Sequence, residues 1–129
     1  IITAPDKSLK IRAKAVKNLI LQMKDNNRKR AIQADSIHAE IQRSPYPVIV
    51  CGDFNDTPAS YTYHRVKKGL TDGFQDVGNG YQYTFRQLYR LWRIDYVFYS
   101  ESLKGQDCFS PDVSYSDHNM VVWRGCVKN

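Results

Sequence analysis

Residues 52–58 read GDFNDTP and directly follow the apolar run VIVC at residues 48–51. The run predicts a short strand over residues 47–52, apolar on both faces, inside a mixed or parallel sheet covered by helices. Asp53 and Asn55 are two residues apart, so on a strand their side chains project to the same side. Such a pair suits a divalent cation, a phosphate or an activated water. Asp and Asn are also favoured in plain turns, which is the alternative for this stretch.

A long helical region precedes the strand. Apolar residues recur at helical spacing over residues 8–43, with Lys and Arg between them. Residues 25–27, Asp-Asn-Asn, interrupt the pattern, so one bent helix or two consecutive helices both fit. The sequence SPYP at 44–47 ends the region, because residues before proline avoid helical angles. We expect residues 1–44 to be helical and residues 45–129 to be rich in strands.

Short elements follow the central motif. Thr57 and Pro58 predict an N-cap and a first helical residue, with a helix over residues 59–66. Residues 70–81 contain three glycines and are expected to be irregular. Strands are predicted at residues 83–85, 93–100, 105–113 and 120–124. Cys51, within the apolar run, is predicted to be a small buried core residue.

Two later motifs carry candidate functional groups. Asp95 is an acid inside an otherwise apolar strand, and a buried carboxylate needs a partner because its desolvation is costly. Ser116, Asp117 and His118 precede the last predicted strand. An acid from another strand would hold the His118 ring in one tautomer, and Asp95 is the natural candidate. We therefore predict a hydrogen bond between His118 and Asp95, with a structural ion pair or a surface turn as the alternatives.

Composition bounds the class of protein. The chain has 129 residues, 42 % hydrophobic and 25 % charged, which is enough for one domain with a modest core. Its net charge of +6 favours anionic partners such as phosphates, nucleic acid or acidic lipid headgroups. A solvated basic helix face gives the same charge.

Together, GDFN at 52–55, RIDY at 93–96 and SDH at 116–118 resemble, in order and spacing, the C-terminal half of the endonuclease/exonuclease/phosphatase superfamily, which has the DNase I-like fold. The resemblance runs from about residue 48 to the end, and residues 1–43 fit the helix before the GDxN strand. The longer form GDFNDTP, followed by SYTY at 60–63, looks like the bacterial hydrolase branch rather than the DNA-repair branch.

The resemblance implies a role for each matched residue. Asp53 would orient or deprotonate the attacking water, and Asn55 would fix that water and a phosphate oxygen. Asp95 would hold His118, whose imidazolium would stabilise charge on the phosphoryl oxygens. Asp117 would help to bind a divalent metal, Mg²⁺ or Mn²⁺, with Asp53 and Asn55 as ligands at a second position. The implied function is metal-dependent phosphoester hydrolysis, by a phosphodiesterase, nuclease or phosphatase.

The resemblance also implies a fold and a missing part. The expected class is α/β (α+β): half of a four-layer DNase I-like sandwich, with one mixed β-sheet covered by helices. Family members carry an N-terminal half that supplies an Asn and the main metal-binding Glu, and neither Glu40 nor Glu101 has a matching context. We expect residues 1–129 to be the C-terminal portion of such a domain, inactive without the N-terminal half.

Two other functions remain open at this stage. Aromatic residues lie among arginines between residues 81 and 93, and such a pattern can stack nucleic-acid bases; core aromatics with neighbouring arginines are the alternative. The second function is a non-catalytic role in assembly, in which copies of the chain associate through the exposed inner face of the half-sandwich and form a homo-oligomer. The partners considered are thus a phosphate-ester substrate, nucleic acid, a phospholipid headgroup, the missing half and a second copy.

Overall fold

The computed structural model describes residues 7–80, 83–85 and 92–129, which divide into two compact units at residues 33 and 34. The first unit contains most of α1, Lys7–Arg43, a single continuous helix of 37 residues. The predicted interruption at residues 25–27 does not break it. Lys29 forms an ion pair with Asp25 one turn earlier, and Arg30 donates a hydrogen bond to Asn27, so polar side chains here satisfy one another along the helix surface.

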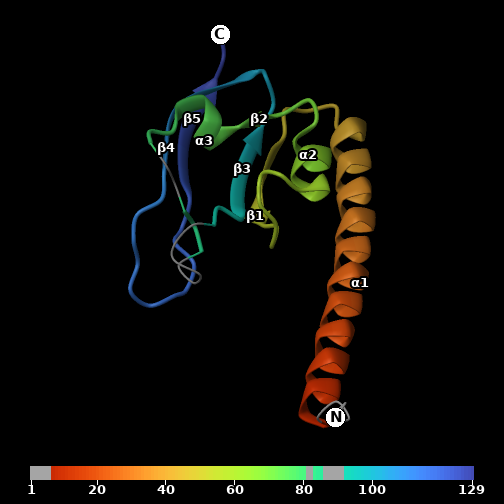
Figure 1. Cartoon of the computed structure of the whole chain (residues 1–129). Coiled ribbons are helices and arrows are strands. Elements are labelled where there is room, and N and C mark those ends of the chain that lie inside the picture. The colour runs from red at the N-terminus through yellow and green to blue at the C-terminus, as the bar shows by residue number, and fades with distance from the viewer. Residues whose placement is uncertain (1–6, 81–82, 86–91) are drawn as a thin grey trace. The chain divides into compact units, whose positions relative to one another are not determined.

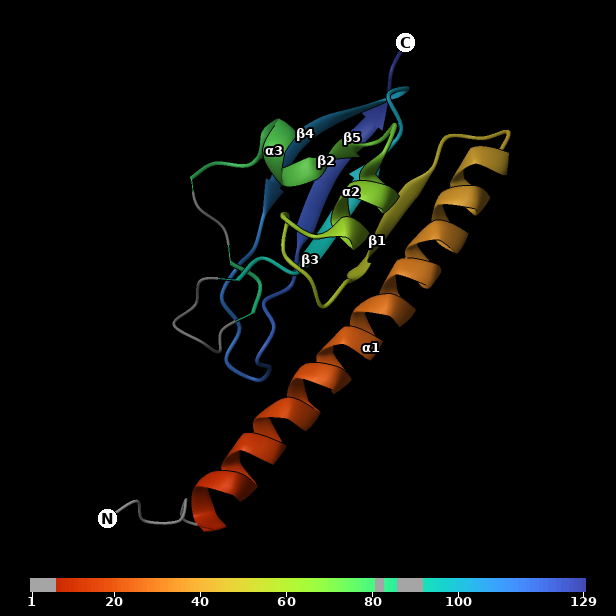
Figure 2. The same ribbon diagram turned by 45° about the vertical axis from the view of Figure 1, so that its right-hand side comes forward.

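The second unit is built on antiparallel strands. β1 (Ile49–Asp53), β3 (Asp95–Tyr99) and β2 (Thr71–Asp72) form a sheet in the order β1-β3-β2, and β4 (Leu103–Phe109) pairs with β5 (Val122–Val127). Figures 1 and 2 show β3 between its two neighbours. The predicted α+β class is confirmed. The expected single mixed sheet is wrong. The described strands form two sheets, and every strand pair in them is antiparallel; β3 inserts between β1 and β2 and runs opposite to both.

Among the described residues β1 is an edge strand, whereas its apolar sequence predicted a strand buried on both faces. Within the described residues it pairs with β3 alone. Most of its side chains are exposed, Cys51 among them, so the expectation of a buried Cys51 is wrong. The apolar run indicated a strand correctly, but composition alone cannot tell whether both sides of that strand are covered.

The core lies on one face of the three-stranded sheet. Tyr96 and Phe98 alternate along β3 and are buried against α2 (Tyr61–Lys67) and the end of α1. Tyr63 packs edge-on to both rings, with centroids 5.0 and 5.3 Å away. Ala34 and Val66 complete the cluster and are fully buried. Because strand side chains alternate, Asp95 and Val97 face the side of the sheet opposite to Tyr96 and Phe98.

The start of α2 differs from the prediction. Ser60 is the N-cap, and its hydroxyl accepts a hydrogen bond from the Tyr63 amide at 3.1 Å. Thr57 instead closes a turn, since its carbonyl accepts from the Ser60 amide at 3.0 Å. The expectation that Thr57 caps the helix is therefore wrong by three residues. Ser60 satisfies the same preference for a short hydroxyl side chain.

The glycine-rich stretch at 70–81 is partly ordered. It contains β2 and the one-turn helix α3 (Gly73–Val77), whose N-cap is Asp72. Gly73 lies where a Cβ would meet Trp123 at 3.0 Å and the Val97 carbonyl oxygen at 3.2 Å. The glycine thus permits close packing rather than a loop. Such short elements carry too few residues for periodicity to reveal them.

The remaining predictions of strands hold with shifted bounds. β3, β4 and β5 fall within or beside the expected ranges. Tyr99 of β3 packs against Trp123 of β5 with ring centroids 4.5 Å apart, which joins the two sheets. Residues 83–85 make isolated bridges at Phe85 instead of a strand. None of the described helices combines the length and apolar character that a membrane span requires.

Candidate active site

Two aspartates face each other across the ends of neighbouring strands. Asp53 is the last residue of β1 and Asp95 the first of β3, and the two are direct partners in the antiparallel register. The register also pairs Cys51 with Val97, so Asp53 and Asp95 lie on the sheet face opposite the aromatic core. The strand pairing alone therefore brings together two carboxylates that are 42 residues apart in the sequence.

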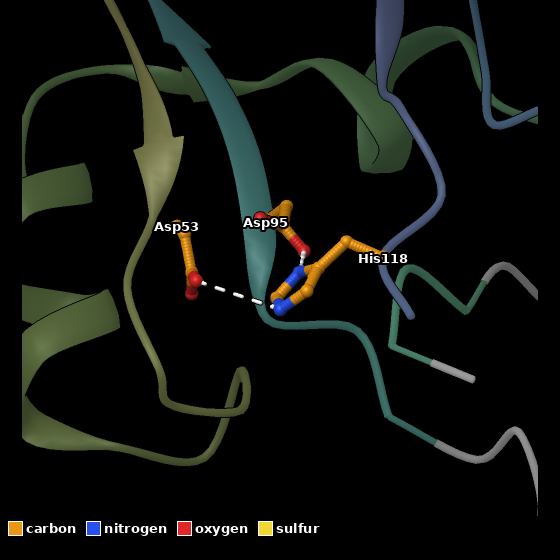
Figure 3. A group of neighbouring side chains, drawn as sticks. All are labelled: Asp53, Asp95 and His118. Carbon is orange, nitrogen blue, oxygen red and sulfur yellow. Dashed lines mark hydrogen bonds and ion pairs between the residues drawn. The ribbon is translucent and has the colours of Figure 1, made fainter. Parts of the chain in front are cut away.

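His118 lies between these carboxylates, as Figure 3 shows. Its Nδ1 is 2.9 Å from Oδ2 of Asp95, and its Nε2 is 3.7 Å from Oδ2 of Asp53. An ionised carboxylate only accepts hydrogen bonds, so Nδ1 carries the proton and donates it to Asp95. The predicted hydrogen bond between His118 and Asp95 is confirmed. Nε2 is left to face Asp53 at a separation too long for a direct hydrogen bond.

The neighbouring acids favour the charged form of the imidazole. The pKa of His118 is raised above its ordinary value of 6.5, first by the hydrogen bond to Asp95 and then by the charges of Asp95, Asp53 and Asp117, while partial burial opposes the shift. Asp95 is the most buried of the three cluster side chains at 18 % exposed, and Asp53 the least at 39 %. The site therefore combines a shielded acid, an imidazole whose charged form is favoured and an acid open to solvent.

Two residues of the predicted site lie outside this cluster. Asn55 is exposed with a φ of +52°, so strand alternation no longer applies at its position. Its backbone amide donates to Oδ1 of Asp53 at 2.8 Å, which fixes that carboxylate in a turn. Asp117 is exposed beside His118 and is not among the three residues whose ligand atoms lie within 4.8 Å of one another, namely Asp53, Asp95 and His118. The roles of Asn55 and Asp117 stay predictions.

The loop after Asp53 is anchored to the core. Phe54 donates its amide proton to the Ile94 carbonyl at 2.9 Å and packs its ring 5.2 Å from that of Tyr96. The Tyr96 hydroxyl lies 2.7 Å from the Asp56 carbonyl oxygen and 2.6 Å from that of Arg93. One phenol thus links the segment after β1 to the segment before β3. Sequence reasoning missed this link, although a tyrosine at a core position of a strand is a signal that its hydroxyl needs a partner.

Asp53, Asp95 and His118 line part of a depression with a volume of about 370 Å³. Apart from the acids and His118, much of its lining is apolar or aromatic, and includes Cys51, Val97, Val113, Tyr115, Met120 and Val121. Tyr115 is 80 % exposed. The charged groups therefore form part of the lining of a mostly apolar depression.

The donor set fits a hard divalent cation in part. Mg²⁺ and Mn²⁺ take carboxylate oxygens, and Oδ2 of Asp53 is not used by the turn that holds Oδ1. The Nδ1 atom of His118 is committed to Asp95, so the three residues form an acid–imidazole pair beside one carboxylate rather than a three-ligand cage. A cation here would need further oxygen ligands, of which the exposed carboxylate of Asp117 is one candidate.

Comparison with known proteins identifies the family. The model of the endonuclease/exonuclease/phosphatase family matches residues 17–118, which include all three motifs. The chain belongs to this family. No curated protein matches it.

Several solved structures share the fold of this chain. A family member from Bacteroides vulgatus is 25 % identical, with a TM-score of 0.66 over 77 % of this chain and 44 % of its own. A conserved protein of unknown function from Enterococcus faecalis V583 is 22 % identical, with a TM-score of 0.70 over 79 % and 46 %. A mannosyl-6-phosphatase from Bacteroides thetaiotaomicron VPI-5482 is 23 % identical, with a TM-score of 0.59 over 74 % and 44 %. The chain spans less than half the length of these structures.

One arginine of the segment between residues 81 and 93, which suggested nucleic-acid binding, is buried. Arg93 is buried and lies 4.9 Å from the Tyr96 ring and 5.0 Å from that of Phe74, so its guanidinium belongs to the core of this endonuclease/exonuclease/phosphatase domain. Trp92 is 41 % exposed. Four further residues of that pattern, Tyr81, Arg86, Tyr89 and Arg90, lie outside the described residues.

Proposed function

We propose that this chain carries the acid–imidazole part of the active site of a metal-dependent phosphoester hydrolase. The observation that carries the proposal is the placement of His118 between Asp95, 2.9 Å from Nδ1, and Asp53, 3.7 Å from Nε2. Membership of the endonuclease/exonuclease/phosphatase family and the fold shared with a mannosyl-6-phosphatase support phosphoester chemistry. The site supports this reaction class, because each group would have a task in the displacement of an ester oxygen by water.

The gap between Asp53 and His118 suits one oxygen atom. An oxygen placed roughly 2.8 Å from both Oδ2 and Nε2 forms a triangle with their 3.7 Å separation, so a water or a phosphoryl oxygen can contact both groups. Asp53 would accept a proton from an attacking water. Nε2, as the free face of the imidazolium, would donate to a phosphoryl oxygen as its charge grows in the transition state.

Asp95 would act through His118. Its hydrogen bond to Nδ1 fixes the ring orientation and favours the charged form of the ring, so that Nε2 holds its proton. Asn55 and Asp117 are assigned by their motifs alone: Asn55 to orient the substrate oxygen, and Asp117 to contribute to cation binding together with Asp53. A bound Mg²⁺ or Mn²⁺ would neutralise phosphoryl oxygens as a Lewis acid.

We further propose that residues 1–129 hydrolyse phosphoesters poorly by themselves. The support is the incomplete oxygen donor set around Asp53 and the coverage of less than half of the related structures. In this proposal the other ligands come from a polypeptide region equivalent to the rest of those structures. The substrate is a phosphate monoester or diester, with nucleic acid and phospholipid headgroups among the candidates.

The test compares the 129-residue chain with the longest reading frame that contains it. Both are assayed for hydrolysis of a chromogenic phosphate monoester and diester, with EDTA and then with added Mg²⁺ or Mn²⁺. We expect cation-dependent activity in the longer protein and little in the chain. Asp53→Asn and His118→Asn should each lower kcat by about 10²–10³-fold.

Matched controls separate the site from general damage. Asp107→Asn removes an acid that forms an exposed pair with Arg124, and His64→Asn removes an exposed histidine of α2. Both should leave kcat unchanged. The proposal fails if His118→Asn retains the wild-type rate, or if the longer protein hydrolyses neither ester with either cation.

A further inference from the structure

Thr84 is fully buried and touches the start of the strand that carries Asp95. Its Oγ1 accepts hydrogen bonds from the backbone amides of Ile94 at 3.0 Å and Asp95 at 3.1 Å. A hydroxyl oxygen has two lone pairs, and here both are directed at consecutive amides. The side chain of Thr84 thus fixes the backbone from which the Asp95 carboxylate projects.

The main chain of the same residue holds the segment that carries His118. The Thr84 carbonyl accepts from the amide of Asn119 at 2.6 Å, and the next residue, Phe85, forms a backbone bridge with His118. The Phe85 ring also lies 5.1 Å from the imidazole. Asn119 is itself buried, and its side-chain carbonyl accepts from the Val113 amide at 3.2 Å. The histidine segment is therefore attached to residues 84–85 by both backbone and ring contacts.

We propose that Thr84 is the positioning residue that sets Asp95 against His118. Its hydroxyl holds one partner and its carbonyl the other, so a single buried residue fixes both sides of a contact between residues 23 positions apart. The relevance of Thr84 to catalysis rests on the proposed function, whereas its hydrogen bonds to the segments that carry Asp95 and His118 do not depend on that function. Thr84 contacts no substrate in this proposal and acts only through the pair.

The hydroxyl can be removed without changing the shape of the side chain. Thr84→Val replaces Oγ1 by a methyl group and leaves the buried Ile94 amide and the partly buried Asp95 amide without their acceptor, whereas Thr84→Ser keeps the oxygen and removes the methyl group. Thr62→Val is the matched control, since Thr62 is a buried threonine in α2, away from the Asp95–His118 contact. The three variants separate loss of the acceptor from loss of volume and from general destabilisation.

The test is NMR on the full 129-residue chain without substrate or metal. In the wild-type chain the amides of Ile94, Asp95 and Asn119 should exchange slowly, and the ¹⁵N shifts of His118 at alkaline pH should report the neutral tautomer protonated at Nδ1. In Thr84→Val we expect the Ile94 and Asp95 amides to exchange about tenfold faster or more, and the ring to move toward the tautomer protonated at Nε2. Thr84→Ser and Thr62→Val should keep the wild-type tautomer.

Two results would overturn the inference. The first is a folded Thr84→Val chain with the wild-type tautomer of His118 and wild-type amide exchange at Asp95. The second, which decides if Thr84→Val does not fold, is fast amide exchange at Ile94, Asp95 and Asn119 in the wild-type chain, because it contradicts the hydrogen bonds of these amides. No readout involves hydrolysis, so failure of this inference is distinguishable from failure of the proposed function.

Discussion

Asp72 and Arg93 form a buried ion pair, in which both carboxylate oxygens lie within 3.1 Å of one guanidinium nitrogen. The two side chains are 1 % and 10 % exposed. The Tyr63 hydroxyl donates to the same carboxylate at 2.5 Å, and burial together with this bond raises the pKa of Tyr63. The pair links β2 to the residue two positions before Asp95, so it supports the site from the opposite side of the sheet.

Asp72→Asn should destabilise the chain strongly. The substitution leaves the Arg93 charge buried without a counter-ion, a change that typically costs about 3–5 kcal/mol. Urea unfolding followed by circular dichroism measures the loss. Asp107→Asn breaks the exposed pair with Arg124 and should cost much less stability, because water screens exposed charges. Equal losses of unfolding free energy in the two variants would show that the buried pair contributes no more to stability than the exposed pair.

Tyr96→Phe should weaken the link between the segment after β1 and the segment before β3. It removes the hydroxyl that contacts the carbonyls of Asp56 and Arg93 while keeping the ring in the core. We expect a loss of about 1 kcal/mol in unfolding free energy and faster amide exchange around Asp56. Tyr46→Phe is the control, because Tyr46 is 76 % exposed. An unchanged stability for Tyr96→Phe would exclude the link as a structural constraint.

Asp95→Asn should lower the pKa of His118 toward its ordinary value of 6.5, because the hydrogen bond to Asp95 is the main cause of the upward shift. NMR titration of the His118 ring protons in the wild-type chain and the variant measures the change. Asp117→Asn removes only a more distant charge and should produce a smaller decrease. A larger effect from Asp117 than from Asp95 would contradict the geometry of the pair.

The same shift makes stability depend on pH. A histidine whose pKa is raised in the folded state binds its proton more tightly there than in the unfolded chain. Its contribution to stability is therefore fully present below pH 6.5 and is lost as the pH rises through the raised pKa. The difference in unfolding free energy between the wild-type chain and His118→Gln should follow this course. A difference that grows with pH across this range would reverse the sign and contradict the assignment.

The sequence predicted the contact between Asp95 and His118 better than it predicted the sheet. Asp95 and His118 were identified from a physical conflict, an acid in an apolar strand that needed a partner, and that reasoning depends on chemistry rather than on topology. Asn55 was placed by strand alternation, which fails because the strand ends at Asp53 and Asn55 adopts a positive φ. Local sequence shows where a polar residue stands, but not where regular geometry stops.

Tertiary pairing explains the other differences. Nothing in residues 48–52 distinguishes an edge strand from a central one, because the distinction lies in which segments pair with them. Asp72 and Thr84 were missed for the same reason: their partners, Arg93 and the amides of residues 94 and 95, become neighbours only through the sheet. Their sequence contexts, TDG and YTF, are ordinary for turns and short strands.

β1 is an edge strand among the described residues, and this position bears on how residues 1–129 behave in concentrated solution. A strand at the edge of a sheet presents unpaired amide and carbonyl groups, and natural proteins discourage strand addition there with proline, lysine or bulges. β1 has neither proline nor a basic residue, and Ile49 is 53 % exposed. The segment that places Asp53 is therefore also one to which another chain can add in concentrated solutions of residues 1–129, so strand addition there would cover the surface beside Asp53.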